Sequence, residues 1–334
     1  MSCESARRFS AQERTPFERR LRKDMEELEQ NDNGIQPQEA PQGPEKSEKS
    51  AKPAKKRMTK RKRALVILLS VFIFISGVLG FLQIGAIYTG KNLEHWLPDY
   101  EKVDIAPILA KKEKTEEDYR TLYYQTGLTK LGIDDLLAEN NTARILRIQN
   151  ALFYDFDIVV DHFNIFTYSE YIDGVAPICA LQDGDILVTS TTRVSWLRYG
   201  HAALVVDGEQ RLIAEAMSPG TKSTLNSADN SFESLANYMV LRPKVDEALK
   251  TQIAEYAKTE LMGVPYRFTI GLFSKKFRKN IKGTQCAHLV WYAYKKFGID
   301  LDGNGGWLVK PRDMAISEHV EVVQAFGFDL DDLW

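Results

Sequence analysis

Cysteine is scarce in this sequence: the three that occur among 334 residues are Cys3, Cys179 and Cys286. They lie far apart, which argues against a disulfide framework. Cys179 and Cys286 are the one pair that a bridge within a domain would join, because Cys3 lies on the other side of a long apolar segment. The sequence also lacks any Cys-x-x-Cys motif and any Cys/His cluster with zinc spacing. We therefore expect neither a bound metal nor a cofactor.

A large net charge is lacking as well, since the formal charge at pH 7 is −2. Basic residues gather in residues 52–63, whereas acidic residues prevail in residues 318–334. No basic surface is expected to extend over the whole chain. The charge pattern therefore argues against nucleic acid as a partner.

Aromatic and branched apolar residues are few in the N-terminal segment after Phe17, where Glu, Gln, Lys, Pro and Ser dominate. A segment of this composition buries too little apolar surface to offset the entropy that ordering costs. The composition predicts a disordered basic tail over residues 1–63.

The one long apolar run of the chain covers residues 64–88, which contain no charged residue and are rich in Leu, Ile, Val and Phe. A helix rises about 1.5 Å per residue, so a run of this length spans the roughly 30 Å hydrocarbon core of a bilayer. A buried core helix explains apolarity on every face less well. A cleaved signal peptide would have an unusually long charged leader, and no A-x-A-like site follows the run. We predict an uncleaved transmembrane helix, with the lipid bilayer as its partner.

The flanks of this run predict its orientation. KKRMTKRKR precedes it, whereas the mixed sequence NLEHWLPDYEK follows Lys91. The positive-inside rule then places the N-terminus in the cytoplasm. The prediction is a single-pass protein of the cell membrane, with everything after about residue 90 outside and with Trp96 and Tyr100 near the outer interface.

Two segments that follow the predicted transmembrane helix have the sequence pattern of helices. Residues 115–126 have a capping Thr, acidic residues in the first turn and Gly127 as a stop signal. Residues 142–153 carry apolar residues at helical spacing. We predict an extracellular helical lead-in over residues 89–178.

The pattern changes at Leu181, where short segments rich in Val, Ile and Leu are separated by Gly and Asp, as is typical of strands. Two helices are predicted after them, over residues 246–262 and 286–297. The expected class is α+β, in which an antiparallel sheet is followed by packing helices. The predicted catalytic domain comprises residues 179–334.

Cys286 lies at the predicted N-terminus of a helix. Unpaired backbone N–H groups and the positive end of the helix dipole stabilise a thiolate there. The same donors can hold the oxyanion of a tetrahedral intermediate. These features make Cys286 a candidate nucleophile; the alternative is a buried cysteine that acts as a small apolar residue.

A thiolate nucleophile needs a base, and His201 is the candidate among five histidines. It begins the strand HAALVV, where a polar ring at the end of an apolar run needs a hydrogen-bond partner. His288 is two residues from Cys286 on the same helix and therefore faces elsewhere. A strand-end histidine with a structural role is the alternative interpretation of His201.

Glu215, an isolated acid in the next strand RLIAEA, is the candidate to hold the imidazole by its other nitrogen. His201 and Glu215 project from the same face if the loop around Asp207 and Gly208 has an odd number of residues. A two-residue turn would place them on opposite faces. The alternative is a solvent-facing glutamate. Tyr266, in GVPYRF, either lines a substrate pocket or packs as a half-buried tyrosine.

The motifs GDILVTS, GHAALVV, AEA and QCAHLVWYAYKKFGIDLD, taken together, resemble the circularly permuted branch of the NlpC-like cysteine peptidases. These are the YiiX- and YebB-like hydrolases, whose fold is papain-like. The resemblance covers roughly residues 181–313, and the histidine precedes the cysteine, which is the permuted order. It implies Cys286 as nucleophile, His201 as base, Glu215 as the orienting residue and Tyr266 as a substrate-binding residue.

What the resemblance implies is amide hydrolysis through an acyl-enzyme. Ala287 replaces the serine that usually follows the cysteine in the family, a departure that leaves the chemistry intact. A domain outside a bacterial membrane faces peptidoglycan, so its peptides are the expected substrate class.

Two other functions remain open. A lipid acyltransferase or esterase of the same fold would suit a domain beside a bilayer, although the Asn-Cys-Glu-His-Phe pattern of the retinol acyltransferase relatives is absent. The second alternative is a non-catalytic module that binds the cell wall. The presence of Cys286, His201 and Glu215 together argues against it, because a binding module needs none of the three.

Overall fold

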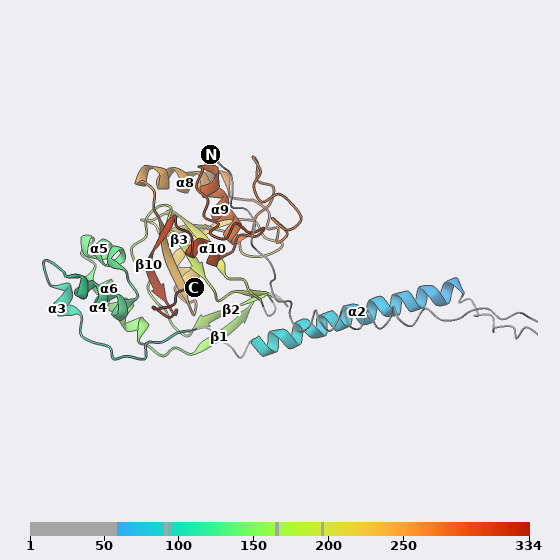
Figure 1. The fold of residues 1–334 in the computed structure, drawn as a ribbon, viewed down its shortest axis with the longest axis horizontal. Coiled ribbons are helices and arrows are strands. Elements are labelled where there is room, and N and C mark those ends of the chain that lie inside the picture. Colours follow the sequence, from blue (N-terminus) through green and yellow to red (C-terminus); the bar gives the residue numbers. More distant parts are fainter. Residues whose placement is uncertain (1–58, 90–92, 94, 164–166, 195–196) are drawn as a thin grey trace, which may run out of the picture. The chain divides into compact units, whose positions relative to one another are not determined.

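Figure 1 shows the computed structural model of the protein. It describes five stretches of the chain: residues 59–89, 93, 95–163, 167–194 and 197–334. The chain divides into two units, residues 1–63 and 64–334. The predicted tail falls in the first unit and, apart from residues 59–63, lies outside the described residues.

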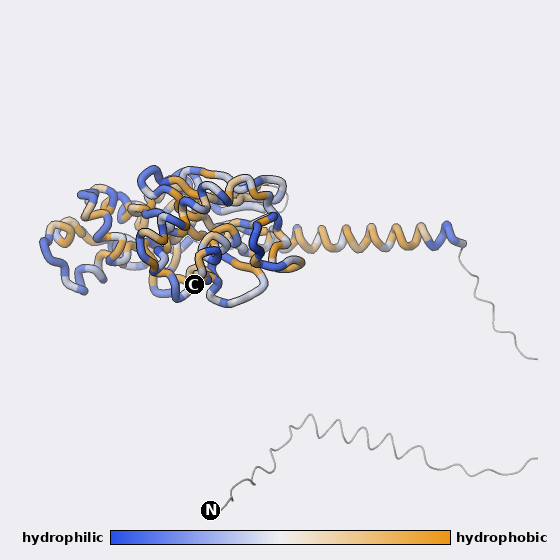
Figure 2. The backbone as a smooth tube through the Cα atoms, turned by 90° about the horizontal axis from the view of Figure 1, so that it is seen from above, coloured by the Kyte–Doolittle hydropathy of each residue, from blue (hydrophilic) through white to orange (hydrophobic). Residues whose placement is uncertain are grey.

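Helix α2 (Lys60–Thr89) contains the long apolar run. Its segment Lys60–Gly85 is long and apolar enough to cross a membrane, and none of it is buried within the structure. Figure 2 shows its basic start in blue, followed by a continuous apolar stretch in orange. The described part of the chain therefore contains one candidate membrane span, close to the predicted one.

An antiparallel sheet of six strands, in the order β10-β9-β3-β6-β7-β8, forms the centre of the globular part. Its strands are β3 (Ile186–Thr189), β6 (His201–Asp207), β7 (Leu212–Glu215), β8 (Thr224–Ser227), β9 (Tyr238–Pro243) and β10 (Val320–Phe326). Strands β3 and β9 are buried along their whole length, and β6 is buried except at its last residue. Their continuous apolar sequences agree with this burial.

A second, smaller antiparallel sheet has the strand order β1-β2-β4-β5. Its strands are β1 (Ile158–His162), β2 (Thr167–Ile172), β4 (Arg193–Val194) and β5 (Leu197–Arg198). The first two lie in the segment for which we predicted a helical lead-in, so that segment is helical only in part. Their β-branched and aromatic residues, in IVVDH and TYSEYI, favour strands.

Four short helices precede the sheets: α3 (Ala106–Leu109), α4 (Glu116–Thr126), α5 (Lys130–Ala138) and α6 (Thr142–Leu152). In a capping box at the start of α4, Thr115 accepts a hydrogen bond from the backbone N–H of Asp118, whose side chain accepts one in return. Gly127 ends this helix with φ 70°. The helices predicted over residues 115–126 and 142–153 are thereby confirmed.

Helices α8 (Glu247–Glu260) and α9 (Cys286–Lys296) both contact β6 and cover one face of the large sheet (Figure 1). Both agree with the predicted helices. Two shorter helices, α7 (Ala228–Phe232) and α10 (Pro311–Ala315), lie between strands along the chain. The structure is therefore of mixed α+β class with antiparallel sheets, as expected.

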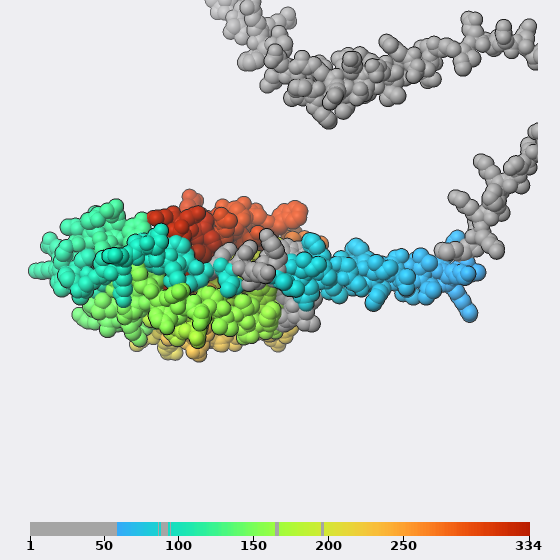
Figure 3. All heavy atoms as spheres, turned by 90° about the horizontal axis from the view of Figure 1, so that it is seen from below, coloured from blue at the N-terminus to red at the C-terminus, as the bar shows by residue number. Residues whose placement is uncertain are grey.

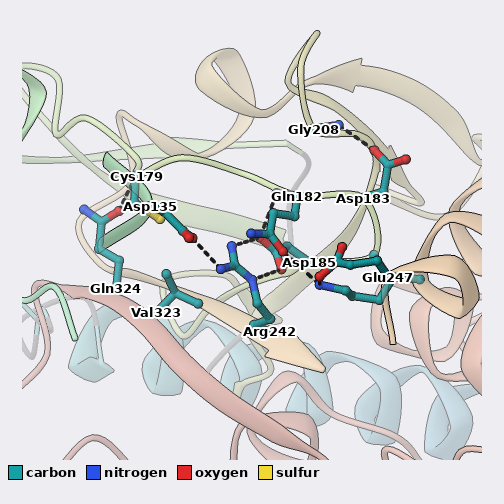
Figure 4. Close-up of polar contacts among 12 residues, drawn as sticks. Asp135, Cys179, Gln182, Asp183, Asp185, Gly208, Arg242, Glu247, Val323 and Gln324 are labelled. Atoms are coloured by element: carbon teal, nitrogen blue, oxygen red, sulfur yellow. Dashed lines mark hydrogen bonds and ion pairs between the residues drawn. The ribbon is translucent and has the colours of Figure 1, made fainter. Parts of the chain in front are cut away.

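A buried ionic cluster joins the lead-in to the large sheet (Figure 4). Arg242 on β9 donates to both carboxylate oxygens of Asp185, over 2.9 and 2.8 Å, and to Asp135 on α5 over 2.5 Å. Burial lowers the pKa of Arg242, but the two carboxylates outweigh it and raise the pKa further above its usual value. The guanidinium therefore stays charged and ties α5 to β9.

The C-terminal segment lies beside the beginning of the lead-in, as the red and teal surfaces in Figure 3 show. The backbone N–H of Trp96 donates to Gly327 over 3.0 Å. Tyr123 donates to the backbone oxygen of Leu330 over 2.9 Å. These contacts close the domain by joining residues more than two hundred positions apart.

Candidate active site

Cys286 is the first residue of α9, and Gln285 in extended conformation precedes it as the N-cap. The side chain of Gln285 does not cap the helix. The first backbone N–H groups of a helix have no partner within it, so Cys286 lies at the end of α9 where unpaired donors are found. Cys286 is 3% exposed. The predicted placement at a helix N-terminus is confirmed.

His201 is the first residue of β6 and pairs with Thr189 of β3. Gly200 precedes it with φ 76°, and a Cβ atom at that position would lie 2.3 Å from the backbone oxygen of Thr189. Only glycine fits this turn, which leads the chain into β6. The imidazole is buried and stacks on Phe232, with ring centroids 5.8 Å apart and planes at 26°.

Glu215 ends β7, and its Oε2 lies 2.7 Å from Nε2 of His201. Its other oxygen accepts hydrogen bonds from Asn226 and from Ser231. Burial raises the pKa of Glu215, but His201 and the two neutral donors outweigh it, so the pKa lies below its usual value. Glu215 is therefore an ionised acceptor, and the Nε2–H of His201 donates to it. Glu215 is buried rather than solvent-facing.

A β-bulge places His201 and Glu215 on one face of the sheet. The register of β6 with β7 shifts by one residue between Val205 and Asp207. On the side of the bulge toward the active site, Val205 pairs with Ile213, so an odd number of residues connects the paired positions. The hairpin loop itself, residues 208–211, has an even number of residues and does not meet the condition that we set. The bulge adds the odd residue, so the two side chains share a face because side chains alternate along a strand.

Cys286 lies close enough to His201 to raise the pKa of its imidazole. Because Nε2 faces Glu215, Nδ1 is the ring nitrogen left for the sulfur. Burial lowers the pKa of His201, but Cys286 and Glu215 outweigh it and raise the pKa to about 10. The structure thus brings together the three residues that the sequence singled out: a thiol, an imidazole and a carboxylate.

Two tyrosines lie close to this group. Burial raises the pKa of Tyr199 and of Tyr266, and in both cases the neighbouring Cys286 raises it further. Tyr266 is half-buried and forms a short parallel bridge with Thr284, two residues before Cys286. The proposed pocket residue therefore lies beside the sulfur.

Sequence reasoning missed Tyr199 and Gln285. The Tyr199 hydroxyl donates to the side-chain oxygen of Gln285, across 86 residues of chain. A tyrosine directly before the Gly-His pair and a glutamine directly before the cysteine were the signals available. This contact ties the loop ahead of His201 to the residue that precedes the sulfur.

His288 is not part of the group formed by Cys286, His201 and Glu215. Its Nε2 donates to the backbone oxygen of Lys276 over 2.8 Å, and its Nδ1 lies 3.0 Å from the hydroxyl of Thr284. Burial lowers the pKa of His288 to about 4, although the backbone hydrogen bond opposes the change. The ring is neutral and structural, in agreement with our choice of His201.

Cys179 and Cys286 are both free thiols. Burial raises the pKa of Cys179 to about 12, so this thiol stays protonated and inert. Within the described ranges, no group of three or more His, Cys, Asp or Glu side chains is placed to hold a metal ion. The chemistry that the arrangement offers is that of a thiol paired with an imidazole.

Comparisons with known proteins give one distant likeness. The chain is 26% identical over 141 residues to "Uncharacterized protein YycO" of Bacillus subtilis (strain 168), which corresponds to 42% of this chain and 54% of YycO. The chain thus covers about half the length of that relative. No family model matches the chain, and no solved structure matches it.

Proposed function

We propose that this protein is a membrane-anchored thiol hydrolase that cleaves amide bonds by way of an acyl-enzyme. The observation that carries the proposal is the buried His201, which is hydrogen-bonded to Glu215 and has Cys286 as a close neighbour. A papain-like fold in circularly permuted order, of the NlpC-like branch, accords with the strand that begins at His201 and the later helix that begins at Cys286.

In the first half of the reaction, His201 takes the proton of Cys286, and the thiolate attacks the carbonyl carbon of the amide. The oxyanion that forms is held by backbone N–H groups at the start of α9. His201, now an imidazolium, gives its proton to the departing amine. The carbon–nitrogen bond breaks and a thioester remains on Cys286.

In the second half, His201 takes a proton from water, and the resulting hydroxide attacks the thioester. The carbonyl re-forms as the thiolate leaves, and the imidazolium returns its proton to the sulfur. Glu215 stabilises the imidazolium in both halves and holds the ring with Nδ1 toward the sulfur. The raised pKa of His201 fits this role, because it marks a site built to hold the protonated ring.

The substrate class that we propose is the peptide part of peptidoglycan. It follows from the candidate span Lys60–Gly85 and the basic residues before it, which favour a cytoplasmic tail and an outward-facing domain. In a bacterium such a domain meets wall peptides. The half-buried Tyr266 beside Cys286 is the proposed contact for them.

The test is digestion of purified peptidoglycan by the full chain in detergent micelles, with analysis of the released muropeptides. Cys286→Ala is the matched control, because it removes only the sulfur. New amide-cleaved fragments with wild type alone support the proposal. Identical muropeptides in both samples would remove wall peptides as the substrate, and release of fatty acid from phospholipid vesicles would favour the esterase. Alkylation of Cys286 by iodoacetamide with the pH dependence of an ordinary free thiol, without either activity, would favour the binding module.

A further inference from the structure

A cavity of about 710 Å³ lies next to the candidate active site without including Cys286 or His201. Tyr199 and Gly200, the two residues before His201, form part of its wall. Its volume is in the roughly 300–1,000 Å³ range of small-molecule sites. It therefore has the size of a ligand site, and its lining indicates the kind of ligand.

The cavity is lined by charges of both signs. Lys310 and Arg312, at the start of α10, contribute two exposed cations, and Asp329 and Asp332, after β10, contribute two exposed carboxylates. None of these four side chains forms an ion pair with any described residue. Unpaired charges of opposite sign in one cavity suit a ligand that carries both signs itself.

Three other residues of the wall add to this pattern. The imidazole of His95 donates from Nδ1 to the backbone oxygen of Ala236 over 2.6 Å. Its Nε2 is then an acceptor, and it is buried without a hydrogen-bond partner among the described residues. Trp96 and Trp334 line the same cavity with amphipathic rings. An ammonium group would satisfy the histidine acceptor and the carboxylates together, and the indoles would pack against glycerol or the first methylenes.

The chain fixes how far this cavity lies from the candidate membrane span. Leu93, in its wall, is four residues beyond Thr89, the last residue of α2. An extended chain spans at most about 3.5 Å per residue, so the wall lies within about 14 Å of the end of that helix. If α2 is the anchor that we propose, the cavity is held at the bilayer surface, where lipid headgroups are the most concentrated solutes.

We propose that this cavity binds the headgroup of a zwitterionic phospholipid that carries a phosphate and a primary amine. Lys310 and Arg312 receive the phosphate, and the ammonium lies between the carboxylates and His95. The inference rests on the proposed anchorage by α2 but not on the proposed hydrolysis, because it uses no catalytic residue.

The test is native mass spectrometry of the full chain released from detergent micelles that contain phosphatidylethanolamine, phosphatidylglycerol or phosphatidylcholine. We expect phosphatidylethanolamine to be retained about tenfold more tightly than the other two, since only it supplies both charges and N–H donors. The double variants Lys310→Gln/Arg312→Gln and Asp329→Asn/Asp332→Asn should each abolish that preference. The double variant Lys244→Gln/Glu318→Gln, which alters exposed charges outside the cavity, should leave it unchanged.

Two competition experiments distinguish the membrane lipid from small soluble molecules that carry the same charged groups. Free glycerophosphoethanolamine should compete with the lipid only weakly, whereas inorganic phosphate alone should not compete. Equal retention of all three lipids, unaffected by either cavity variant, would overturn the proposal. Binding of the zwitterionic dipeptide D-alanyl-D-alanine in place of lipid would also overturn it and make the cavity a peptide site. The Cys286→Ala variant should bind lipid like wild type, so a failure here is distinguishable from a failure of the proposed hydrolysis.

Discussion

Two buried clusters of three ionisable side chains, built from similar parts, differ in what they can do. In the first, Arg242 joins Asp185 to Asp135; in the second, His201 is hydrogen-bonded to Glu215 and lies beside Cys286. Each connects segments that are far apart in sequence. The difference lies in the central group, because a guanidinium does not release its proton in a protein, whereas an imidazole exchanges one readily.

The surroundings of the two clusters reinforce this difference. Both oxygens of Asp185 are occupied by Arg242, so no acceptor on that carboxylate faces a ligand. Cys286, by contrast, has the start of α9 on one side and two tyrosines beside it. Because Arg242 keeps its proton, its cluster has a structural role. Because His201 can exchange a proton next to a thiol, its cluster is a candidate reaction centre.

The largest effect should follow from Cys286→Ala, measured as the rate of amide cleavage. Loss of the nucleophile should reduce the rate by about 10⁴-fold or more, because the members of a catalytic triad act as a unit. The free energy of unfolding should change little, since a single sulfur atom is removed from a residue at a helix end. Retention of more than a tenth of the wild-type rate would assign the reaction to another group.

Arg242→Met is expected to change the free energy of unfolding more than the rate of amide cleavage, the opposite of Cys286→Ala. It leaves Asp185 buried and unpaired and should lower the free energy of unfolding by about 3–5 kcal/mol. Urea denaturation of the globular part, followed by tryptophan fluorescence, measures this change. Lys244→Met, two residues along the chain and exposed, is the matched control, because its ammonium contacts only a backbone oxygen. Equal losses for the two variants would mean that the cluster carries no stability of its own.

The sequence was sufficient to predict features that depend on local periodicity. Cys286 at a helix start, and His201 and Glu215 on consecutive strands, follow from apolar spacing and from Gly and Asp at the turns. The shared face was left open, because it depends on the bulge between Val205 and Asp207. The turn after the bulge contains Arg211, whose φ of 54° is rare outside glycine and which no sequence pattern marks.

Contacts between loops were beyond prediction for a different reason. Tyr199 and Gln285 are 86 residues apart and belong to no regular pattern, so nothing local marks them as partners. The ionic cluster of Arg242 likewise joins residues 107 positions apart. The strands β1 and β2 were missed although most of their residues are β-branched or aromatic, because they follow a segment with strong helical signals.

A smaller effect is expected from Gly200→Ala, which acts on the turn that positions His201. The new Cβ would meet the backbone oxygen of Thr189 at 2.3 Å in a left-handed conformation. We expect a loss of about 2–3 kcal/mol in the free energy of unfolding, together with slower amide cleavage, because the imidazole is displaced. Gly263→Ala is the control, with φ 75° but nothing within 4 Å of the new Cβ. It should cost only about 1 kcal/mol, and an equal cost at both sites would show that the crowding at Gly200 relaxes freely.

The smallest effect, and the one that tests the comparison most directly, is expected from Glu215→Gln. The amide keeps the shape of the carboxylate but removes its charge, so the pKa of His201 should fall from about 10 by roughly one unit or more. Histidine-labelled protein, titrated by NMR with His201→Gln to assign the signal, measures this shift.

The raised pKa of His201 also determines how the free energy of unfolding depends on pH. A pKa of His201 raised above 6.5 stabilises the fold fully below that pH, and the stabilisation is lost as pH rises through about 10. The lowered pKa of Glu215 contributes stability above its usual value, which is lost as pH falls through the folded-state pKa. In Glu215→Gln the alkaline loss should therefore begin at lower pH, and the acid-side contribution of this group should vanish. Arg242→Met should alter neither feature near pH 7 to 10, because a guanidinium does not titrate there; a shifted alkaline limb in that variant would mean that the two clusters are coupled.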